Sequence, residues 1–253
     1  MKLGMPILYE FDSIEQNLKL ANQLGLDFVE LNLNFGYCRK EMEEQTVLAL
    51  LKKYNLEATL HFYDEADFAS YDEVVEAYLK LLKKYASLGK DYIKIVNVHN
   101  ICGPVVTISG VKNYIYEKEY DEYIKRLIRN LNKAKEILKE FNIELVIENT
   151  TIASYMIKTY NDLYENGFYF NYDIGHDNND NDMLLKITEK IKLPFKEFHI
   201  HDGNRKTCHL CLGSGDIDIK KFKDLAILNN SYVVLEVKKQ QDVIKSVDYF
   251  KKI

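Results

Sequence analysis

The chain has 253 residues, a formal net charge of −5 and 47% hydrophobic residues. This length and composition suit one globular domain with a sizeable core, and they are typical of a (β/α)8 barrel. The acidic balance gives no overall attraction to nucleic acid or to an anionic membrane, although it leaves a local basic groove open. No apolar run approaches the roughly 20 residues that a membrane-spanning helix needs.

Short β-type runs alternate with helical patterns along the whole chain. The predicted strands are 7–10, 28–32, 58–61, 92–99 and 143–148, followed by strands that end at Asp173, His201 and Val237. The predicted helices include one from the N-cap Ser13 to near Gly25, and others at about 41–54, 71–88, 117–141 and 241–250. Eight βα units in this length predict a single closed (β/α)8 barrel over residues 1–253. No G-x-G-x-x-G follows the first strand, which argues against a dinucleotide-binding fold.

The N-terminal residues and the cysteines bear on the compartment. Residues 1–6 lead into a charged helix, so no signal peptide is expected. Four cysteines in a long chain do not resemble a disulfide framework, and Cys208-x-x-Cys211 without a second such pair favours a structural thiol pair over a zinc site. A reducing cytoplasm is the simplest compartment. The segment 101–116 is the longest insertion, and its role as a lid or an interface stays open, as does the oligomeric state.

Four predicted strands each end in a metal-type ligand, spaced by about one strand plus one helix. These ligands are Glu148, Asp173, His199 and Glu236. Parallel barrel strands deliver their C-terminal residues to one face, so the four side chains are expected to converge. Oxygen and imidazole ligands around an open position are typical of a catalytic divalent-metal site. The alternatives are solvated glutamates at the barrel rim and an ordinary Asx turn at Asp173.

Further polar residues fall at the same predicted face. His61 and His99 end strands, and His176, Arg205 and His209 lie in loops just beyond strand ends. Arg205 is a natural clamp for a hydroxyl or phosphate oxygen, and its alternative is a surface arginine. Asp202 is the expected support of the His199 imidazole, because a ligating histidine usually has an outer partner. Asp218 is expected to cap the helix that follows it.

Together these motifs resemble the xylose isomerase-like TIM-barrel superfamily, which includes sugar (phosphate) isomerases, epimerases and endonuclease IV. The resemblance rests on Ile147-Glu148-Asn149, Asp173-Ile174-Gly175-His176, His199-Ile200-His201-Asp202, Leu212-Gly213-Ser214-Gly215-Asp216-Ile217-Asp218 and Leu235-Glu236. The spacing from His199 to Asn204-Arg205 is similar to that of ketose 3-epimerases. This resemblance implies one Mn²⁺, Mg²⁺, Co²⁺ or similar ion on Glu148, Asp173, His199 and Glu236. It also implies proton transfer by Glu148 and Glu236, with His176 and Arg205 holding oxygens of a small sugar.

The endonuclease IV branch implies a different use of the same residues. Its three zinc ions would recruit His61, His99, His176 and His209 as additional ligands. Here Thr207-Cys208-His209 stands where that family has Asp-Arg-His, so an aspartate ligand of the third zinc is missing. The DNA-binding loops of that family are also short in this chain, and the chain is acidic. The expected function is therefore metal-dependent isomerisation or epimerisation of a small sugar or sugar-like hydroxy-carbonyl compound, with His61 and His99 contacting substrate. The alternatives are a zinc phosphodiesterase acting on abasic DNA and a barrel that binds sugar without catalysis.

Overall fold

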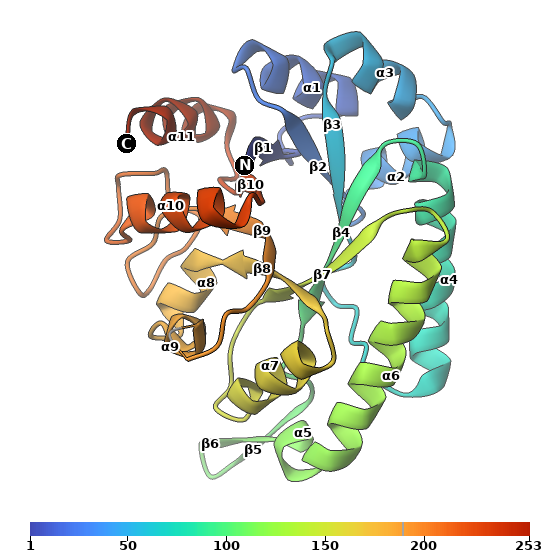
Figure 1. The fold of residues 1–253 in the computed structure, drawn as a ribbon, viewed down its shortest axis with the longest axis vertical. Helices are drawn as coiled ribbons and strands as arrows, with labels where there is room; N and C mark the ends of the chain where they lie inside the picture. The colour runs from blue at the N-terminus through green and yellow to red at the C-terminus, as the bar shows by residue number, and fades with distance from the viewer. Residues whose placement is uncertain (189) are drawn as a thin grey trace.

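Eight parallel strands close into a barrel in a computed structural model, which describes residues 1–188 and 190–253 (Figure 1). The strands are β1 (Lys2–Pro6), β2 (Phe28–Asn32), β3 (Glu57–His61), β4 (Ile93–Asn100), β7 (Glu144–Asn149), β8 (Tyr169–Asp173), β9 (Phe195–Ile200) and β10 (Tyr232–Leu235). Around the barrel they run in the order β1-β10-β9-β8-β7-β4-β3-β2, and β1 pairs with β2 to complete the ring. The predicted (β/α)8 fold is confirmed.

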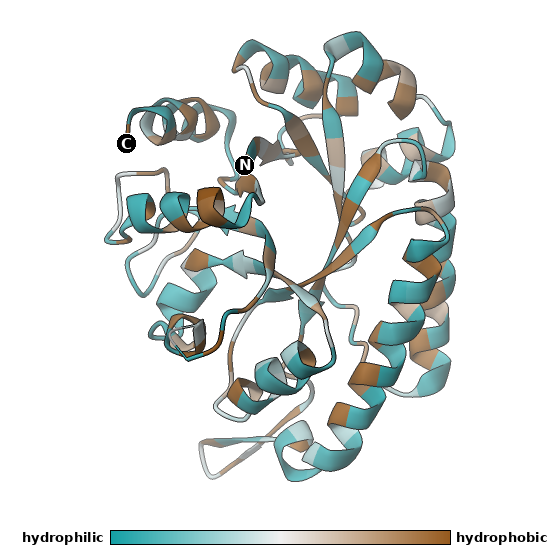
Figure 2. Cartoon of the chain, viewed as in Figure 1, coloured by the Kyte–Doolittle hydropathy of each residue, from teal (hydrophilic) through white to brown (hydrophobic). Residues whose placement is uncertain are grey.

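Helices cover the outside of the barrel. They are α1 (Ile14–Gln23), α2 (Gly36–Glu43), α3 (Val47–Tyr54), α4 (Asp72–Gly89), α6 (Tyr120–Lys139), α7 (Met156–Glu165), α8 (Ile174–Asn179), α9 (Met183–Thr188), α10 (Ile219–Asn229) and α11 (Gln240–Lys252). The long helices α4 and α6 lie side by side. Apolar and polar stretches alternate along α6, as Figure 2 shows, because one face packs on the barrel while the other meets solvent. No helix among the described residues is long and apolar enough to cross a membrane.

Three predicted element boundaries are wrong. The first strand is Lys2–Pro6 rather than residues 7–10, and Tyr9 is 85% exposed. The helix predicted at 41–54 is two helices, because Gln45 between them has a left-handed φ of 57°. The helix predicted at 117–141 is also interrupted: a short helix α5 (Ile115–Lys118) precedes α6.

The insertion predicted at 101–116 has its own structure. It contains an antiparallel hairpin of β5 (Val105–Ile108) and β6 (Val111–Tyr114), and α5 follows at once. In Figure 1 the hairpin lies at the edge of the molecule, away from the barrel strands. The residues before it, Ile101 and Cys102, line a cavity at the C-terminal ends of the strands.

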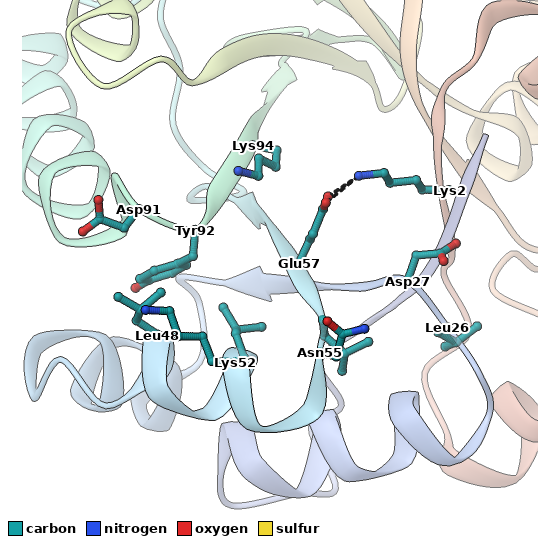
Figure 3. A pocket seen from close by; sticks show the side chains of 12 residues that line it. Lys2, Leu26, Asp27, Leu48, Lys52, Asn55, Glu57, Asp91, Tyr92 and Lys94 are labelled. Carbon is teal, nitrogen blue, oxygen red and sulfur yellow. Dashed lines mark hydrogen bonds and ion pairs between the residues drawn. The ribbon is translucent and has the colours of Figure 1, made fainter.

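The opposite end of the barrel has a cavity of about 490 Å³, drawn in Figure 3. Two of its charged side chains pair: Lys2 Nζ lies 2.5 Å from Glu57 Oε2, and the Tyr232 hydroxyl donates to the same oxygen at 2.9 Å. This end of a barrel usually serves stability, whereas catalytic groups sit at the C-terminal ends of the strands. The predicted ligands all lie at the C-terminal ends of the strands.

Candidate metal centre

The four predicted ligands meet in one buried group. Glu148 lies near the end of β7, Asp173 ends β8, His199 lies near the end of β9 and Glu236 follows β10. One donor atom from each side chain lies within 4.8 Å of the others, and none of the four residues is more than 6% exposed. His199 Nδ1 is 3.3 Å from Glu148 Oε1, 3.5 Å from Glu236 Oε2 and 4.0 Å from Asp173 Oδ2. Ligands at about 2.1 Å from a tetrahedral ion are separated by about 3.4 Å, so these spacings suit a small divalent cation.

The hydrogen bonds of His199 assign its two ring nitrogens. Nε2 lies 3.1 Å from Glu30 Oε1 on β2, and because a carboxylate oxygen can only accept, Nε2 carries the proton. In the neutral ring, Nδ1 then offers a lone pair toward three carboxylates. Neither His199 Nδ1 nor Glu236 Oε2 has a hydrogen-bond partner, although both atoms are buried. Converging lone pairs without a donor among them fit a bound cation.

The electrostatics of the group agree with this assignment. Burial works against a charged His199, but Glu148, Glu30 and Glu236 outweigh it and raise the pKa of the imidazole well above its ordinary value. Burial likewise opposes ionisation of Glu148, yet His199 and His99 hold its pKa well below its ordinary value. The group is therefore a site of strong negative potential that takes up positive charge, as a proton or as a metal ion.

Asp173 is held in place from three directions. Its Oδ1 accepts from the His176 backbone N–H at 2.7 Å, which makes it the N-cap of α8. His201 Nδ1 accepts from the His209 N–H at 2.8 Å, so the proton of His201 lies on Nε2, which donates to Asp173 at 3.1 Å. Asn149 exchanges two hydrogen bonds with the Asp173 backbone. The Asx turn considered for this motif is present, and it orients the carboxylate within the four-residue group.

The two glutamates also have specific partners. Glu148 Oε2 accepts from the side-chain amides of Asn97 and Asn171. Glu236 Oε1 accepts from Lys238 Nζ at 2.6 Å. Burial opposes ionisation of Glu236, but Lys238 and the nearby histidines keep its pKa well below its ordinary value. Both glutamates are thus held as ionised carboxylates, which suits binding of a cation.

His61 and His99 form a second group with Glu148. Each Nδ1 lies 3.0 Å from a backbone carbonyl oxygen, of Phe62 and Asp64 respectively, so each Nδ1 carries a proton. Their Nε2 atoms face each other at 3.2 Å and lie 3.5 and 3.8 Å from Glu148 Oε2. Two bare lone pairs at this distance need a positive charge between them. That charge can come from a second cation or from a proton on His61. Burial would lower the pKa of His61, but Glu148 raises it to about 10.

The other predicted residues are placed less uniformly. His176 and His209 line the cavity above the group, and His209 Nδ1 donates to the Glu236 carbonyl at 3.0 Å. Arg205 does not line this cavity in the described structure. Its guanidinium bonds to Asp182 Oδ2 at 2.6 Å and to the Asn178 carbonyl at 3.0 Å, so it would have to leave these partners to hold a substrate.

The expected support of His199 by Asp202 is wrong, because Glu30 fills that position. The buried Asp202 carboxylate instead accepts four backbone N–H groups of the following loop, from Gly203, Gly213, Gly215 and Ile217. It fixes the glycine-rich turn before α10. Asp218 caps α10 as predicted, through the Lys221 N–H.

The cavity above the group has a volume of about 530 Å³. Of the four ligands, Glu148 and Glu236 line it, while Asp173 and His199 lie beneath them with 0% exposure. Its charged lining is mostly acidic, and Lys238 is the one lysine or arginine among the described residues that line it. The remaining lining residues are Asn32, His61, Asp64, Glu65, His99, Ile101, Cys102, Thr150, Thr151, His176 and His209.

The sequence analysis did not identify Glu30 and Lys238 as residues of the site. It placed His201 at the barrel face but did not predict that His201 supports Asp173. Glu30 stands in mid-strand, Phe28-Val29-Glu30-Leu31-Asn32, and an acid inside an otherwise apolar strand was the available signal. His201 had no such signal, because its role follows from Asp173, 28 positions away. Lys238 lies only two residues after the predicted ligand Glu236, and that proximity was the signal available for it.

Comparisons with known proteins agree with the fold. The model of the xylose isomerase-like TIM barrel family matches residues 18–253. The uncharacterized protein MJ1614 of Methanocaldococcus jannaschii is 31% identical over 100% of this chain and 99% of its own length.

Solved structures show the same architecture. A D-tagatose 3-epimerase-like protein superposes with a TM-score of 0.80 at 19% identity, covering 100% of this chain and 96% of that one. The 3-keto-D-glucoside 4-epimerase YcjR of E. coli gives 0.77 at 17% identity with both chains fully covered. At these identities the likeness establishes the fold. The family model and the relative go further: the chain belongs to the xylose isomerase-like TIM barrel family.

Proposed function

We propose that this protein is a metal-dependent isomerase or epimerase of a small sugar or sugar-like hydroxy-carbonyl compound. One observation carries the proposal: within a buried group of four metal-type ligands, only the two glutamates also line the cavity. Structural neighbours described as sugar 3- and 4-epimerases support the same class of reaction. The four ligands Glu148, Asp173, His199 and Glu236 would hold a divalent ion such as Mn²⁺, Mg²⁺, Co²⁺ or Zn²⁺, which polarises a substrate carbonyl and favours negative charge on its oxygen.

The glutamates supply the proton chemistry. Both are held ionised by their neighbours, so either can accept the proton from the carbon beside the carbonyl. Return of a proton to the adjacent carbon gives an isomer, and return to the opposite face of the same carbon gives an epimer. Lys238 keeps one oxygen of Glu236 engaged at 2.6 Å and so fixes the direction in which the other oxygen points.

The cavity favours an uncharged substrate. A phosphate group is normally bound by several N–H donors or cations, whereas Lys238 is already paired with Glu236. Asp64 and Glu65 add negative charge at the lining. His61, His99, His176 and, after release from Asp182, Arg205 are the proposed hydroxyl contacts.

Isotope exchange tests the reaction even when the product is unidentified. Metal-loaded protein is incubated in D₂O with a panel of unphosphorylated ketoses and aldoses, and ¹H NMR follows loss of the C–H signal beside the carbonyl. We expect deuterium incorporation with a new sugar, and a roughly 10²- to 10⁴-fold slower exchange in Glu148→Gln. The exposed Glu122→Gln is the matched control and should exchange at the wild-type rate. A metal-loaded wild type that exchanges no sugar of the panel contradicts the proposal.

The second candidate is a zinc phosphodiesterase, and the His61–His99–Glu148 group is the observation that favours it. It requires at least two zinc ions per chain, with Glu148 shared between them. Mass spectrometry of metal content separates the two candidates. If the protein is a phosphodiesterase, His61→Ala should lose one zinc, and the wild-type protein should cleave abasic DNA. The acidic cavity argues against it, because a DNA backbone needs clustered lysine and arginine.

A further inference from the structure

Glu30 lies outside the set of predicted ligands, yet it is as buried as they are. It stands in the middle of β2 with 1% exposure, and its Oε1 accepts from His199 Nε2 at 3.1 Å. In the barrel order, β1 and β10 separate β2 from β9, so this hydrogen bond spans the barrel interior. The two residues are 169 positions apart in the sequence.

The barrel interior is an unusual place for this carboxylate. Barrel cores are normally filled by branched apolar side chains, and a buried carboxylate is costly unless it is paired. Glu30 is paired with an imidazole that faces three further carboxylates on its other side. The contact therefore links a side chain of the core to the face where the ligands converge.

We propose that Glu30 is a positioning residue that sets the metal affinity of the Glu148–Asp173–His199–Glu236 group. By accepting the Nε2 proton it fixes the tautomer of His199, so that Nδ1 presents its lone pair to the ion. It also prevents rotation of the ring and increases the electron density on Nδ1. Outer carboxylates of this kind typically change metal affinity by 10- to 100-fold. The inference rests on the metal site of the proposed function, but not on its reaction.

Distances alone would allow another role for Glu30, since Glu30, Glu197 and His199 also offer donor atoms within 4.8 Å of one another. Glu197 is 0% exposed, and neither of its oxygens has a hydrogen-bond partner. A cation there would need the His199 Nε2 lone pair and would turn the imidazole into a bridge between two ions. The hydrogen bond from Nε2 to Glu30 uses that position for a proton, so we assign positioning rather than ligation.

Metal binding itself is the test. Apo protein, prepared with a chelator, is titrated with Co²⁺, and calorimetry gives Kd while the visible absorption of Co²⁺ reports its ligand geometry. Glu30→Gln keeps an oxygen acceptor but loses the charge, and its Kd should rise about 10-fold. Glu30→Met loses both, and its Kd should rise toward 100-fold with an altered Co²⁺ spectrum. If Glu30→Met does not fold, the nearly isosteric Glu30→Gln decides the question.

Glu197→Gln is the matched control, because it alters a carboxyl of equal burial that makes no hydrogen bond to His199. Its Kd should stay within about threefold of wild type. Folded Glu30 variants with wild-type Kd overturn the inference and leave the proposed function standing. Equal weakening of Co²⁺ binding in Glu30→Gln and Glu197→Gln also overturns the inference. So does a second Co²⁺ that the wild type binds and both variants lose. A wild type that binds no Co²⁺ removes the proposed metal site and the inference together.

Discussion

Each histidine of the centre has its role assigned by the partner of its other nitrogen. His199 donates from Nε2 to Glu30 and so offers Nδ1 to the ligand group. His201, two residues further along the chain, accepts at Nδ1 from the His209 N–H and so donates to Asp173. We propose one histidine as a ligand and the other as its neighbour's support, although both are buried at the same end of the barrel. Their spacing alone cannot separate these roles.

Close packing around His201 gives the first residue-scale prediction. An ideal Cβ at Gly175 would lie 1.8 Å from His201 Cε1 and 2.3 Å from its Nδ1. Gly175→Ala must therefore displace the ring and weaken its hydrogen bond to Asp173. We expect a loss of about 1–3 kcal/mol in the free energy of unfolding, measured by urea denaturation, together with weaker Co²⁺ binding.

The matched control is Gly36→Ala in the first turn of α2, where a Cβ would meet nothing within 4 Å. Because alanine is favoured over glycine in helices, this variant should be neutral or more stable by up to about 1 kcal/mol. A Gly175→Ala protein as stable as Gly36→Ala would show that His201 is not tightly held.

At the scale of elements, the alternation of strands and helices was predictable because the periodicity of apolar residues is local. The ends of elements were not. Ile7 and Leu8 are buried as an inward-facing strand would be, yet they lie beyond β1. The break between α2 and α3 depends on the left-handed backbone of Gln45, a conformation that a glutamine in the sequence does not predict.

A side-chain contact that holds α5 against the preceding loops gives a pH-dependent prediction. Asp67 Oδ2 accepts from the Tyr116 hydroxyl at 2.5 Å. Burial raises the pKa of Asp67 above its ordinary value of 3.8, although the hydrogen bonds from Tyr116 and Ala69 work against the rise. Between 3.8 and the raised value, the folded protein binds this proton more tightly than the unfolded chain does. The contribution of Asp67 to stability is therefore largest at low pH and is lost as the pH rises through the raised pKa.

The measurement compares wild type with Asp67→Asn by denaturant unfolding at several pH values from about 4 to 6.5. The stability of wild type relative to the variant should decrease as the pH rises. Asp121→Asn, an exposed position in the first turn of α6, serves as the control and should show no such trend. A difference between wild type and Asp67→Asn that grows with pH would mean that the hydrogen bonds outweigh burial.

At the scale of the whole molecule, the barrel combines an apolar shell with a polar interior. Between strands and helices the core is apolar, but inside the ring Glu30, Thr59, Asn97, Asn171 and Glu197 are all buried. Several of their polar atoms have no hydrogen-bond partner. Such groups cost stability unless a ligand compensates, so we expect the proposed ion to stabilise the C-terminal end of the barrel.

The four predicted ligands could be recognised in the sequence because each lies at or within one residue of the C-terminal end of a strand, and closure of the barrel then brings them together. The sequence did not predict the roles of Glu30, Lys238 and Asp202. Lys238 bonds to Glu236 two residues before it, a contact that depends on side-chain direction rather than on spacing. Glu30 acts through a histidine on another strand, and Asp202 acts through backbone N–H groups of a loop, so both roles are set only when the ring closes. The glycine-rich loop after β9 is an example: its residues were recognised as one motif of the family resemblance, but not as the donors that surround Asp202.

Removal of the metal tests how far the stability of the whole fold depends on the proposed ion. An ion that binds only the native state at 100 times its Kd adds about 2.7 kcal/mol to the free energy of unfolding. For a domain of this size we expect Tm to fall by roughly 5–10 °C when a chelator removes the ion, and to recover when Mn²⁺ or Co²⁺ is added back. Differential scanning calorimetry measures both the decrease and the recovery of Tm.

Glu236→Gln should lose the metal-dependent part of Tm, because it removes the charge of a proposed ligand whose Oε2 is otherwise unpartnered. The exposed Glu122→Gln should keep it. A metal-dependent increase in Tm that survives in Glu236→Gln would place the ion away from the four-residue group.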